Sequence, residues 1–319
     1  MSNESKSEIR DQKSKILFLF TRTPLHVGAG SSVGAIDQPI IRERHTGFPV
    51  IPASSLKGTF ADAWNDDGMR QRQFKRVIKQ QDGSWDDNTV AAWLFGSDDA
   101  NHSFAGALQF SEAKLLAFPV RSAKGSFAWI TCPLILARAA RNGVLSDSLL
   151  PTVKPTDEQA IFSANGPLSL DDKIVLEEYT FSLVGNDEAA KVGDALKKLF
   201  AGDRVWQGVA DRLVILSDGM MSFFAENACE VAQHVRISDE TGTAEGGALF
   251  NQENVPSETM FYAIVHAFPG RGSAFSSKTP QSALDEFEKK IKDRPFQFGG
   301  DASTGLGWCS LKLDGAKGD

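Results

Sequence analysis

Little in this 319-residue sequence points to disulfides, a membrane anchor or a free-standing nucleic-acid binder. Its three cysteines are far apart and never in a C-x-x-C spacing, which predicts no disulfide framework and no zinc site. No apolar run approaches the roughly 18 residues of a spanning helix, and the polar start MSNESKSEIRDQKSK is not typical of a signal peptide. A net charge of −7 argues against a surface that is basic all over, but it allows one basic face. We therefore expect a cytoplasmic protein with no membrane segment.

Familiar catalytic and nucleotide-binding motifs are also missing. There is no H-E-x-x-H pair, no G-x-S-x-G nucleophile elbow and no G-x-x-x-x-G-K-[ST] phosphate loop. The glycine-rich segment 299–308, GGDASTGLGW, has no G-x-G-x-x-G frame, and it leads into a predicted strand where a dinucleotide site requires a helix. On its own, this segment is equally consistent with a tight turn between strands.

The order of predicted elements favours an α+β fold. Continuous or alternating apolar runs predict strands at 15–20, 106–118, 173–184 and 259–268. Helical spacing predicts helices that include 53–64, the end of 127–143, 188–200 and 281–293, with Ser54 or Ser55 as the cap of the first. Strands and helices are interleaved without strict alternation, which is not typical of a doubly wound sheet. The spans 144–172 and 236–257 read as loop-rich, and the second is a polar insertion that is functional, mobile or disordered.

The segment 25–58 combines two loops of small residues with charged side chains. Glycine lets main-chain N–H groups approach a ligand closely, and a helix N-terminus with unpaired donors suits a phosphate. Lys57 could add a positive charge there, and the run of basic residues between 70 and 79 could extend the strip along a polyanion. That run could equally be a solvated face. Asp37 also lies within this segment, and it could brace a turn or lie beside a bound polyanion, where one carboxylate makes only a weak metal site.

Several of these segments resemble a known family. PLHVGAGSSVGAIDQPIIRERHTGFPVIPASSLKGTF resembles the start of the repeated backbone subunit of the type III-B CRISPR effector, the Cmr complex, in the RAMP superfamily. FAWITCPLILARAAR, VLEEYTF, EGGALFNQENVPSETMFYAIV and FQFGGDASTGLGW follow in the expected order, so the resemblance covers nearly the whole chain. The related Csm backbone subunit shares part of it, but the CPL and GGALF segments favour the Cmr type.

The resemblance implies one RAMP domain over 1–319, with a modified RRM-like, ferredoxin-like palm and inserted subdomains. It implies a guide-binding and catalytic loop region at 25–58, a helical insertion around 60–103, and a projecting β-hairpin, the thumb, within 236–257. The thumb would interrupt guide–target pairing at regular intervals. The residues expected to bind RNA are Gly28, Gly30, Ser31, Arg42, Arg44, Ser54, Ser55, Lys57, Gly58, Gly299, Gly300, Gly305 and Gly307.

The resemblance also implies an endoribonuclease. Asp37 matches the acid linked to target-RNA cleavage, with His26 as a candidate helper, and the expected products carry 2′,3′-cyclic phosphate and 5′-hydroxyl ends. A divalent metal, Mg²⁺ or Mn²⁺, is expected, with Asp37 as a ligand. The expected partners are crRNA, single-stranded target RNA, further copies of the chain in a filament, and other Cmr subunits that include the large polymerase-like subunit and the small subunit.

Three alternatives stay open on the sequence. The chain could be a non-catalytic filament subunit in which Asp37 is a turn residue, or a Csm-type backbone subunit. It could also be a RAMP enzyme that processes precursor guide RNA, which would normally use His or Tyr/Lys chemistry.

Overall fold

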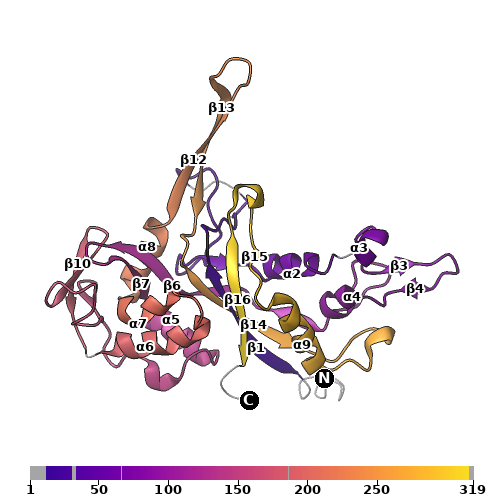
Figure 1. Ribbon diagram of the computed structural model, residues 1–319, viewed down its shortest axis with the longest axis horizontal. Coiled ribbons are helices and arrows are strands. Elements are labelled where there is room, and N and C mark those ends of the chain that lie inside the picture. Colours follow the sequence, from indigo (N-terminus) through magenta and orange to yellow (C-terminus); the bar gives the residue numbers. More distant parts are fainter. Residues whose placement is uncertain (1–11, 31–33, 66, 186, 316–319) are drawn as a thin grey trace.

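A computed structural model describes residues 12–30, 34–65, 67–185 and 187–315 (Figure 1). Its core is an antiparallel sheet in which four long strands lie in the order β16–β1–β14–β6. These strands are β1 (Lys13–Thr21), β6 (Ala113–Ser122), β14 (Met260–Ala267) and β16 (Trp308–Gly315). In chain order this is the 4-1-3-2 arrangement of a ferredoxin-like sheet, so the predicted α+β fold with an RRM-like palm is confirmed.

Two helices, α2 (Ala53–Asp62) and α9 (Pro280–Ile291), pack on the palm with interlocking aromatic rings. Leu56 and Phe60 form the buried face of α2, as their four-residue spacing predicts. The ring of Phe60 meets the edge of Phe287 on α9 at a centroid distance of 4.9 Å. The predicted serine cap of α2 is wrong: Pro52 occupies the N-cap position without a side-chain cap bond, so both serines lie inside the first turn.

A module of helices and short strands packs on the other face of β1 and lies to the left in Figure 1. Phe20 of β1 contacts Trp206 at a centroid distance of 5.0 Å, and Trp129 of β7 packs edge-on against the same indole at 5.3 Å. The elements of this module are β7 (Ser126–Thr131), α5 (Pro133–Arg141), β8 (Gln159–Ala160), β9 (Lys173–Leu176), β10 (Tyr179–Leu183), α6 (Glu188–Lys197), α7 (Val209–Arg212), β11 (Leu213–Ile215) and α8 (Asp218–Asn227).

Two predicted strands are each divided in the structure. The segment 173–184 forms the hairpin β9–β10, because Glu177 adopts a left-handed conformation with a φ of 50° that turns the chain. The segment 106–118 forms β5 (Leu108–Phe110) and the start of β6, and both strands pair with β14, whose register shifts where it meets β6. Periodicity detects the strand character of such runs but not the break within them.

An arm to the right in Figure 1 corresponds to the expected insertion around 60–103. It contains α3 (Asp67–Gln71), the two-stranded ribbon β3 (Ile78–Lys79) and β4 (Trp85–Asp86), and α4 (Val90–Phe95). Trp85 stacks on His102 with a centroid distance of 4.8 Å and an interplanar angle of 6°. The insertion is therefore a mixture of short helices and a ribbon.

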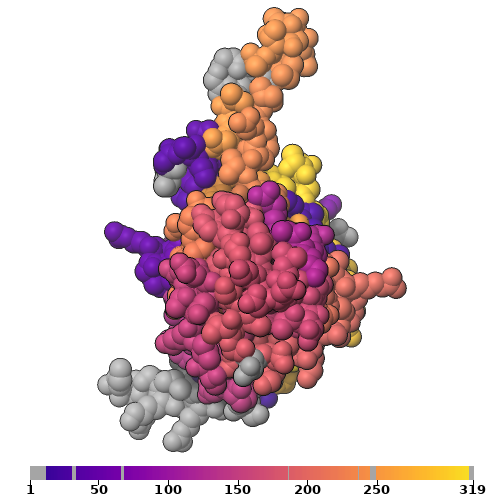
Figure 2. All heavy atoms as spheres, turned by 90° about the vertical axis from the view of Figure 1, so that its left-hand side faces the viewer, coloured from indigo at the N-terminus to yellow at the C-terminus, as the bar shows by residue number. Residues whose placement is uncertain are grey.

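A long β-hairpin projects from the top of the palm (Figures 1 and 2). Its strands are β12 (Glu230–Ile237) and β13 (Ala244–Asn254), which pair antiparallel with Glu230 opposite Asn254 at the foot. The segment 236–257, which reads as loop-rich, therefore consists largely of strand, and the hairpin begins at 230. Two short strands near the palm, β2 (Val50–Ile51) and β15 (Phe296–Gln297), complete the main elements. Within the described ranges, no helix is both long and apolar enough to cross a membrane.

Candidate nucleic-acid interface

Three segments that are far apart in the sequence meet at the foot of the hairpin. The N–H of Gly300 donates to the carbonyl of His26 at 2.9 Å, and the N–H of Gly307 donates to the carbonyl of Pro24 at 2.8 Å. Leu25 forms a β-bridge with Val255, just after β13. In Figure 1, the indigo loop after β1 and the yellow loop before β16 accordingly lie beside this foot. The structure therefore brings together the two glycine-bearing loops that the sequence predicts to bind RNA.

Two glycines of the second loop are required by close backbone contacts. A Cβ atom on Gly299 would lie 2.0 Å from the carbonyl oxygen of His26, and the residue has a φ of 77°. A Cβ on Gly307 would lie 2.0 Å from the carbonyl oxygen of Phe298, with a φ of 79°. Gly305 also has a positive φ, of 86°, but the space around it is open. A side chain at position 299 would push the two loops apart, and one at position 307 would distort the second loop itself.

A single amide holds the second loop from inside. The Nε2 atom of Gln297 lies 3.1–3.2 Å from the carbonyl oxygens of Phe298, Gly299, Gly300 and Leu306. An amide nitrogen has two hydrogens, so these four acceptors share its donors. This contact fixes the curvature of the loop, and the sequence analysis did not identify Gln297.

His26 lies buried between the two loops. Its Nδ1 is 2.7 Å from the carbonyl oxygen of Glu253, so this nitrogen carries a hydrogen and donates it. Its Nε2 faces Gly28, where a Cβ would approach to 3.0 Å. Only 8% of His26 is exposed. This position favours a structural role, and its predicted role as a helper in cleavage gains no support from it.

The first loop is open at its tip. Residues 25–29 run beside 38–42, with a bridge between Gly28 and Ile40 and a 2.9 Å bond from the N–H of Ala29 to the carbonyl of Pro39. Gly30 is exposed, with a φ of 83° and no atom near its Cβ position. The predicted RNA contact Ser31 lies outside the described residues.

Asp37 is exposed and lies beside strand β13 of the hairpin. Its carboxylate Oδ2 accepts from the N–H of Asn251 at 2.9 Å, and its own N–H donates to Oδ1 of Asn251 at 2.7 Å. Residues 37–38 therefore lie next to the hairpin, about three residues, or roughly 10 Å, from its foot. An exposed carboxylate at the base of a projecting element can reach a ligand that lies along that element.

A metal site built by this chain does not fit the observed side chains. In the parts of the chain that the structure describes, no group of three or more His, Cys, Asp or Glu residues is placed to hold a metal ion. Asp37 would supply one carboxylate. Mg²⁺ often binds through one or two carboxylates together with phosphate oxygens, so RNA would have to provide most of the ligands.

Arg42 is held within the protein. Its guanidinium donates to the carbonyls of Gly47 and Ala225, both at 2.7 Å, and pairs with the carboxylate of Glu253 at 2.5 Å. The side chains of Arg42 and Glu253 are only 18% and 4% exposed. These bonds favour a structural role for Arg42, and its role as an RNA contact stays a prediction. Arg44 is exposed and, among the described residues, has no partner.

The first turn of α2 has the features that suit an anion. Ser54, Lys57 and Gly58 are exposed, Ser55 is half-buried, and neither serine hydroxyl has a partner among the residues described. Partial burial of the ammonium group, and then the charge of Arg76, lower the pKa of Lys57. Through Phe60, which contacts Phe298 at a centroid distance of 5.6 Å, the helix packs beneath the second glycine loop.

The basic run from 70 to 79 is not a continuous free strip. Arg72 pairs with the carboxylate of Asp86, and Arg76 lies 4.0 Å from that of Asp98. Within the arm, the two arginines therefore hold the ribbon and the following loop together. These ion pairs favour a structural role for Arg72 and Arg76 over contact with a polyanion.

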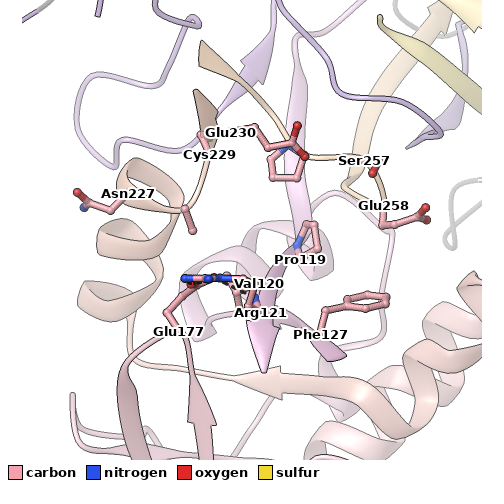
Figure 3. Close-up of a pocket in the computed structure, with 12 residues that line it drawn as sticks. Pro119, Val120, Arg121, Phe127, Glu177, Asn227, Cys229, Glu230, Ser257 and Glu258 are labelled. Carbon is pink, nitrogen blue, oxygen red and sulfur yellow. Dashed lines mark hydrogen bonds and ion pairs between the residues drawn. The ribbon is translucent and has the colours of Figure 1, made fainter. Parts of the chain in front are cut away.

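The surface also has a cavity of about 490 Å³ at the foot of the hairpin (Figure 3). Arg121 and Glu177 are paired at one end, and the carboxylate of Glu230 lies at the other; burial raises the pKa of Glu230. The residues around it are Pro119, Val120, Arg121, Phe127, Glu177, Asn227, Ala228, Cys229, Glu230, Pro256, Ser257 and Glu258. None of the predicted site residues lines this cavity, so the candidate interface is an open surface made by loops.

Comparison with known proteins identifies the family. The model of the RAMP superfamily matches residues 19–310. The chain belongs to the RAMP superfamily. A relative from Pyrococcus furiosus, named CRISPR system Cmr endoribonuclease Cmr4, is 31% identical over 306 residues, which cover 94% of this chain and 96% of that protein.

Solved structures support the assignment of the chain to the RAMP superfamily. The crystal structure of oligomeric Cmr4 from Pyrococcus furiosus matches with a TM-score of 0.67 at 25% identity, covering 95% of this chain and 98% of that one. A chain in the cryo-EM structure of the type III-B Cmr-beta bound to cognate target RNA matches with a TM-score of 0.64 at 20% identity, covering 94% and 96% of the two chains. The second match supports the RAMP fold alone.

Sequence reasoning missed the polar run Asn251–Gln252–Glu253 at the end of β13. Gln252 donates to the carboxylate of Asp301 in the second glycine loop at 2.7 Å, and Glu253 accepts from the N–H of Ile40 at 3.0 Å. Gln252 and Glu253 are only 1% and 3% exposed. The signal was available, because consecutive polar residues directly before the buried strand 259–268 are unusual unless they have partners.

Proposed function

We propose that this chain is a repeated backbone subunit of a type III-B CRISPR (Cmr) complex, which holds crRNA and cleaves target RNA. Similarity to Cmr4 over nearly the whole of both chains supports the Cmr type over the Csm type. The observation that carries the proposal is the position of Asp37, an exposed acid beside the projecting hairpin where the glycine loops converge.

The guide RNA would lie along the glycine loops and the first turn of α2. Gly30 is exposed and Gly305 has open space at its Cβ position, so a phosphodiester backbone can approach the main chain, whose N–H groups donate to phosphate. Ser54 and Lys57 add a hydroxyl and a positive charge at a helix N-terminus, which is favourable for an anion. None of these contacts reads a base, so the grip would be independent of guide sequence.

The hairpin β12–β13 would be the thumb that interrupts guide–target pairing. Val231, Val235, Ile237 and Leu249 are exposed on it, with Leu249 67% exposed and directly opposite Val235. Exposed apolar side chains on a projecting element suit a wedge that enters between base steps and unstacks them. A wedge of this kind would displace one target nucleotide for each copy of the subunit.

Cleavage would follow from that displacement. In the reaction, the 2′-oxygen forms a bond to the adjacent phosphorus while the bond to the 5′-oxygen breaks, which leaves a 2′,3′-cyclic phosphate and a 5′-hydroxyl. Duplex geometry prevents the in-line approach, and a displaced ribose can adopt it, so positioning supplies much of the rate. Asp37 would accept the proton of the 2′-hydroxyl, and the leaving 5′-oxygen would take up a proton from water.

Further copies of the chain and other Cmr subunits, including the large polymerase-like and the small subunit, are part of the proposal. The oligomeric state named for the Pyrococcus furiosus Cmr4 crystal structure supports self-assembly. A requirement for Mg²⁺ or Mn²⁺ remains a prediction from the family resemblance. Among the described residues, Asp37 would supply one carboxylate to the ion, and RNA would have to supply most of the other ligands.

The test is cleavage of target RNA by the reconstituted complex. Asp37→Ala should bind target with unchanged affinity and cut it at least 100-fold more slowly, and removal of the hairpin tip should abolish the regular spacing of the cuts. EDTA added to the wild-type complex tests the metal requirement. If Asp37→Ala loses binding and cutting together, Asp37 is architectural and the subunit is not the nuclease.

A processing enzyme for precursor guide RNA is the remaining alternative. It would be favoured if the isolated subunit cut a repeat hairpin cleanly. The burial of His26 weakens this alternative, because that histidine is not exposed for proton transfer to a substrate.

A further inference from the structure

The side chain of Asn251 and the loop that carries Asp37 hold each other by a reciprocal set of hydrogen bonds. Oδ1 of Asn251 accepts from the N–H of Asp37 at 2.7 Å, and Nδ2 of Asn251 donates to the carbonyl of Ala35 at 3.0 Å. The main-chain N–H of Asn251 donates to Oδ2 of Asp37 at 2.9 Å. One hairpin residue therefore contacts the acid-bearing loop at Ala35 and at both the main chain and the carboxylate of Asp37.

Main-chain pairing continues this contact along the strand. The N–H of Gln38 donates to the carbonyl of Asn251 at 3.1 Å, and the N–H of Glu253 donates to the carbonyl of Gln38 at 3.0 Å. Gln38 thus forms a parallel bridge with Gln252. Residues 37–38 therefore lie alongside β13, held by a single bridge, and their position is set by the hairpin.

The contribution of the Asn251 side chain can be separated from that of its backbone. Any residue at position 251 keeps the main-chain N–H that binds Oδ2 of Asp37. The side-chain amide of Asn251 supplies both the acceptor for the Asp37 N–H and the donor for the Ala35 carbonyl, and alanine supplies neither. Loss of the side chain would free the backbone on the N-terminal side of the acid, at the Ala35 carbonyl and the Asp37 N–H, while leaving the main-chain pairing of Gln38 intact.

We infer that Asn251 is the positioning residue for Asp37, and that it aligns the acid with the hairpin. This inference rests on the proposed role of Asp37 in cleavage. The element that would displace the target nucleotide and the acid that would meet the displaced ribose are then one rigid unit. The distance from the wedge to the carboxylate stays constant when the hairpin moves, so each displaced nucleotide meets the acid in the same geometry.

The first experiment compares Asn251→Ala with the wild type in the reconstituted complex. Misplacement of a reacting group by about 1 Å can cost roughly 100-fold in rate, so we expect single-turnover cleavage to fall roughly 10- to 100-fold. The affinity for target RNA and the positions of the cuts should not change. Thermal unfolding of the subunit reports any general loss of structure.

Gln233→Ala is the matched control. Gln233 pairs with Asn251 across the hairpin, is exposed, and has no side-chain partner among the described residues. It removes the same kind of amide at the same height of the hairpin without touching the loop. Its cleavage rate should equal that of the wild type.

A second variant, Asn251→Asp, tests the pH–rate profile of cleavage, which would not change if Asn251 had only a structural role. It keeps an acceptor for the N–H of Asp37, removes the donor to the Ala35 carbonyl, and places a second negative charge beside the carboxylate that is proposed to take the proton. Among nearby charged groups, Glu253 on β13 is already paired with Arg42. The pH–rate profile of cleavage should therefore shift to higher pH, with the rate partly recovered in alkaline buffer.

The outcomes separate this inference from the proposed function. If Asp37→Ala does not slow cleavage, the proposed function fails first. If Asp37→Ala abolishes cleavage but Asn251→Ala cuts at the wild-type rate, or Asn251→Asp leaves the pH profile unchanged, the positioning role is refuted. A parallel loss of target binding and cleavage in Asn251→Ala would also overturn it.

Discussion

Arg42→Ala should destabilise the subunit in the absence of any RNA. Truncation leaves the carboxylate of Glu253, 4% exposed, without its guanidinium partner, and the carbonyls of Gly47 and Ala225 lose a donor. Breaking a buried ion pair by removing one partner typically costs about 3–5 kcal/mol. One oxygen of Glu253 keeps the N–H of Ile40, so we expect the lower half of this range, about 3–4 kcal/mol.

Urea unfolding of the isolated subunit measures this effect directly. Arg44→Ala is the control, because Arg44 is exposed and unpaired among the described residues, and its free energy of unfolding should not change. Adding Glu253→Gln to Arg42→Ala should restore part of the loss, since the buried charge is then gone. If Arg42→Ala unfolds at the same urea concentration as the wild type and the complex loses only crRNA, Arg42 is a phosphate contact and the structural interpretation is wrong.

Two further predictions concern the second glycine loop and Glu258, which lies between β13 and β14. Gly299→Ala should separate the two loops and weaken crRNA retention, because its Cβ would lie 2.0 Å from the carbonyl of His26. Gly202→Ala is the control, because Gly202 is exposed, lies outside both loops and has open space at its Cβ position; it should retain crRNA, and equal loss in both variants would contradict the steric argument. Burial, and then the charge of Asp203, raise the pKa of Glu258 to about 7 from its usual 4.5. A raised carboxyl pKa means that stability falls as pH rises between these two values, so Glu258→Gln should stabilise the subunit at pH 8 but not at pH 4. Because the group is half exposed, we expect only about 1 kcal/mol in thermal or urea unfolding, and a pH-independent effect would refute this cause.

Much of the palm could be predicted from local pattern. The run 259–268 and the spacing of Leu56 and Phe60 follow the periods of a strand and a helix, and the structure has these elements close to the expected bounds. The cap of α2 was wrong because a proline in the preceding position already starts the helix. The division of 173–184 into two strands was missed because a non-glycine residue, Glu177, makes the turn.

For the candidate site, the sequence predicted which kinds of residue are present better than it predicted what each residue does. Glycines and an acid near a basic segment indicate a phosphate-binding loop, and resemblance to a family named the same positions. The role of Arg42 could not be predicted, because its partner Glu253 is 211 residues away in the sequence. The same holds for Asn251 and Asp37, which are separated by 214 residues.

By itself, the sequence determined that this chain forms an α+β RAMP domain, with few cysteines, no apolar run of membrane-spanning length, and two glycine-bearing segments. These properties depend on composition and on short-range periodicity, which act within a few residues. Only the tertiary structure decided which polar side chains are bonded within the protein and which are exposed to a ligand. The reason is physical: a hydrogen bond or an ion pair depends on distances of about 3 Å, and folding brings such groups together from opposite ends of the chain.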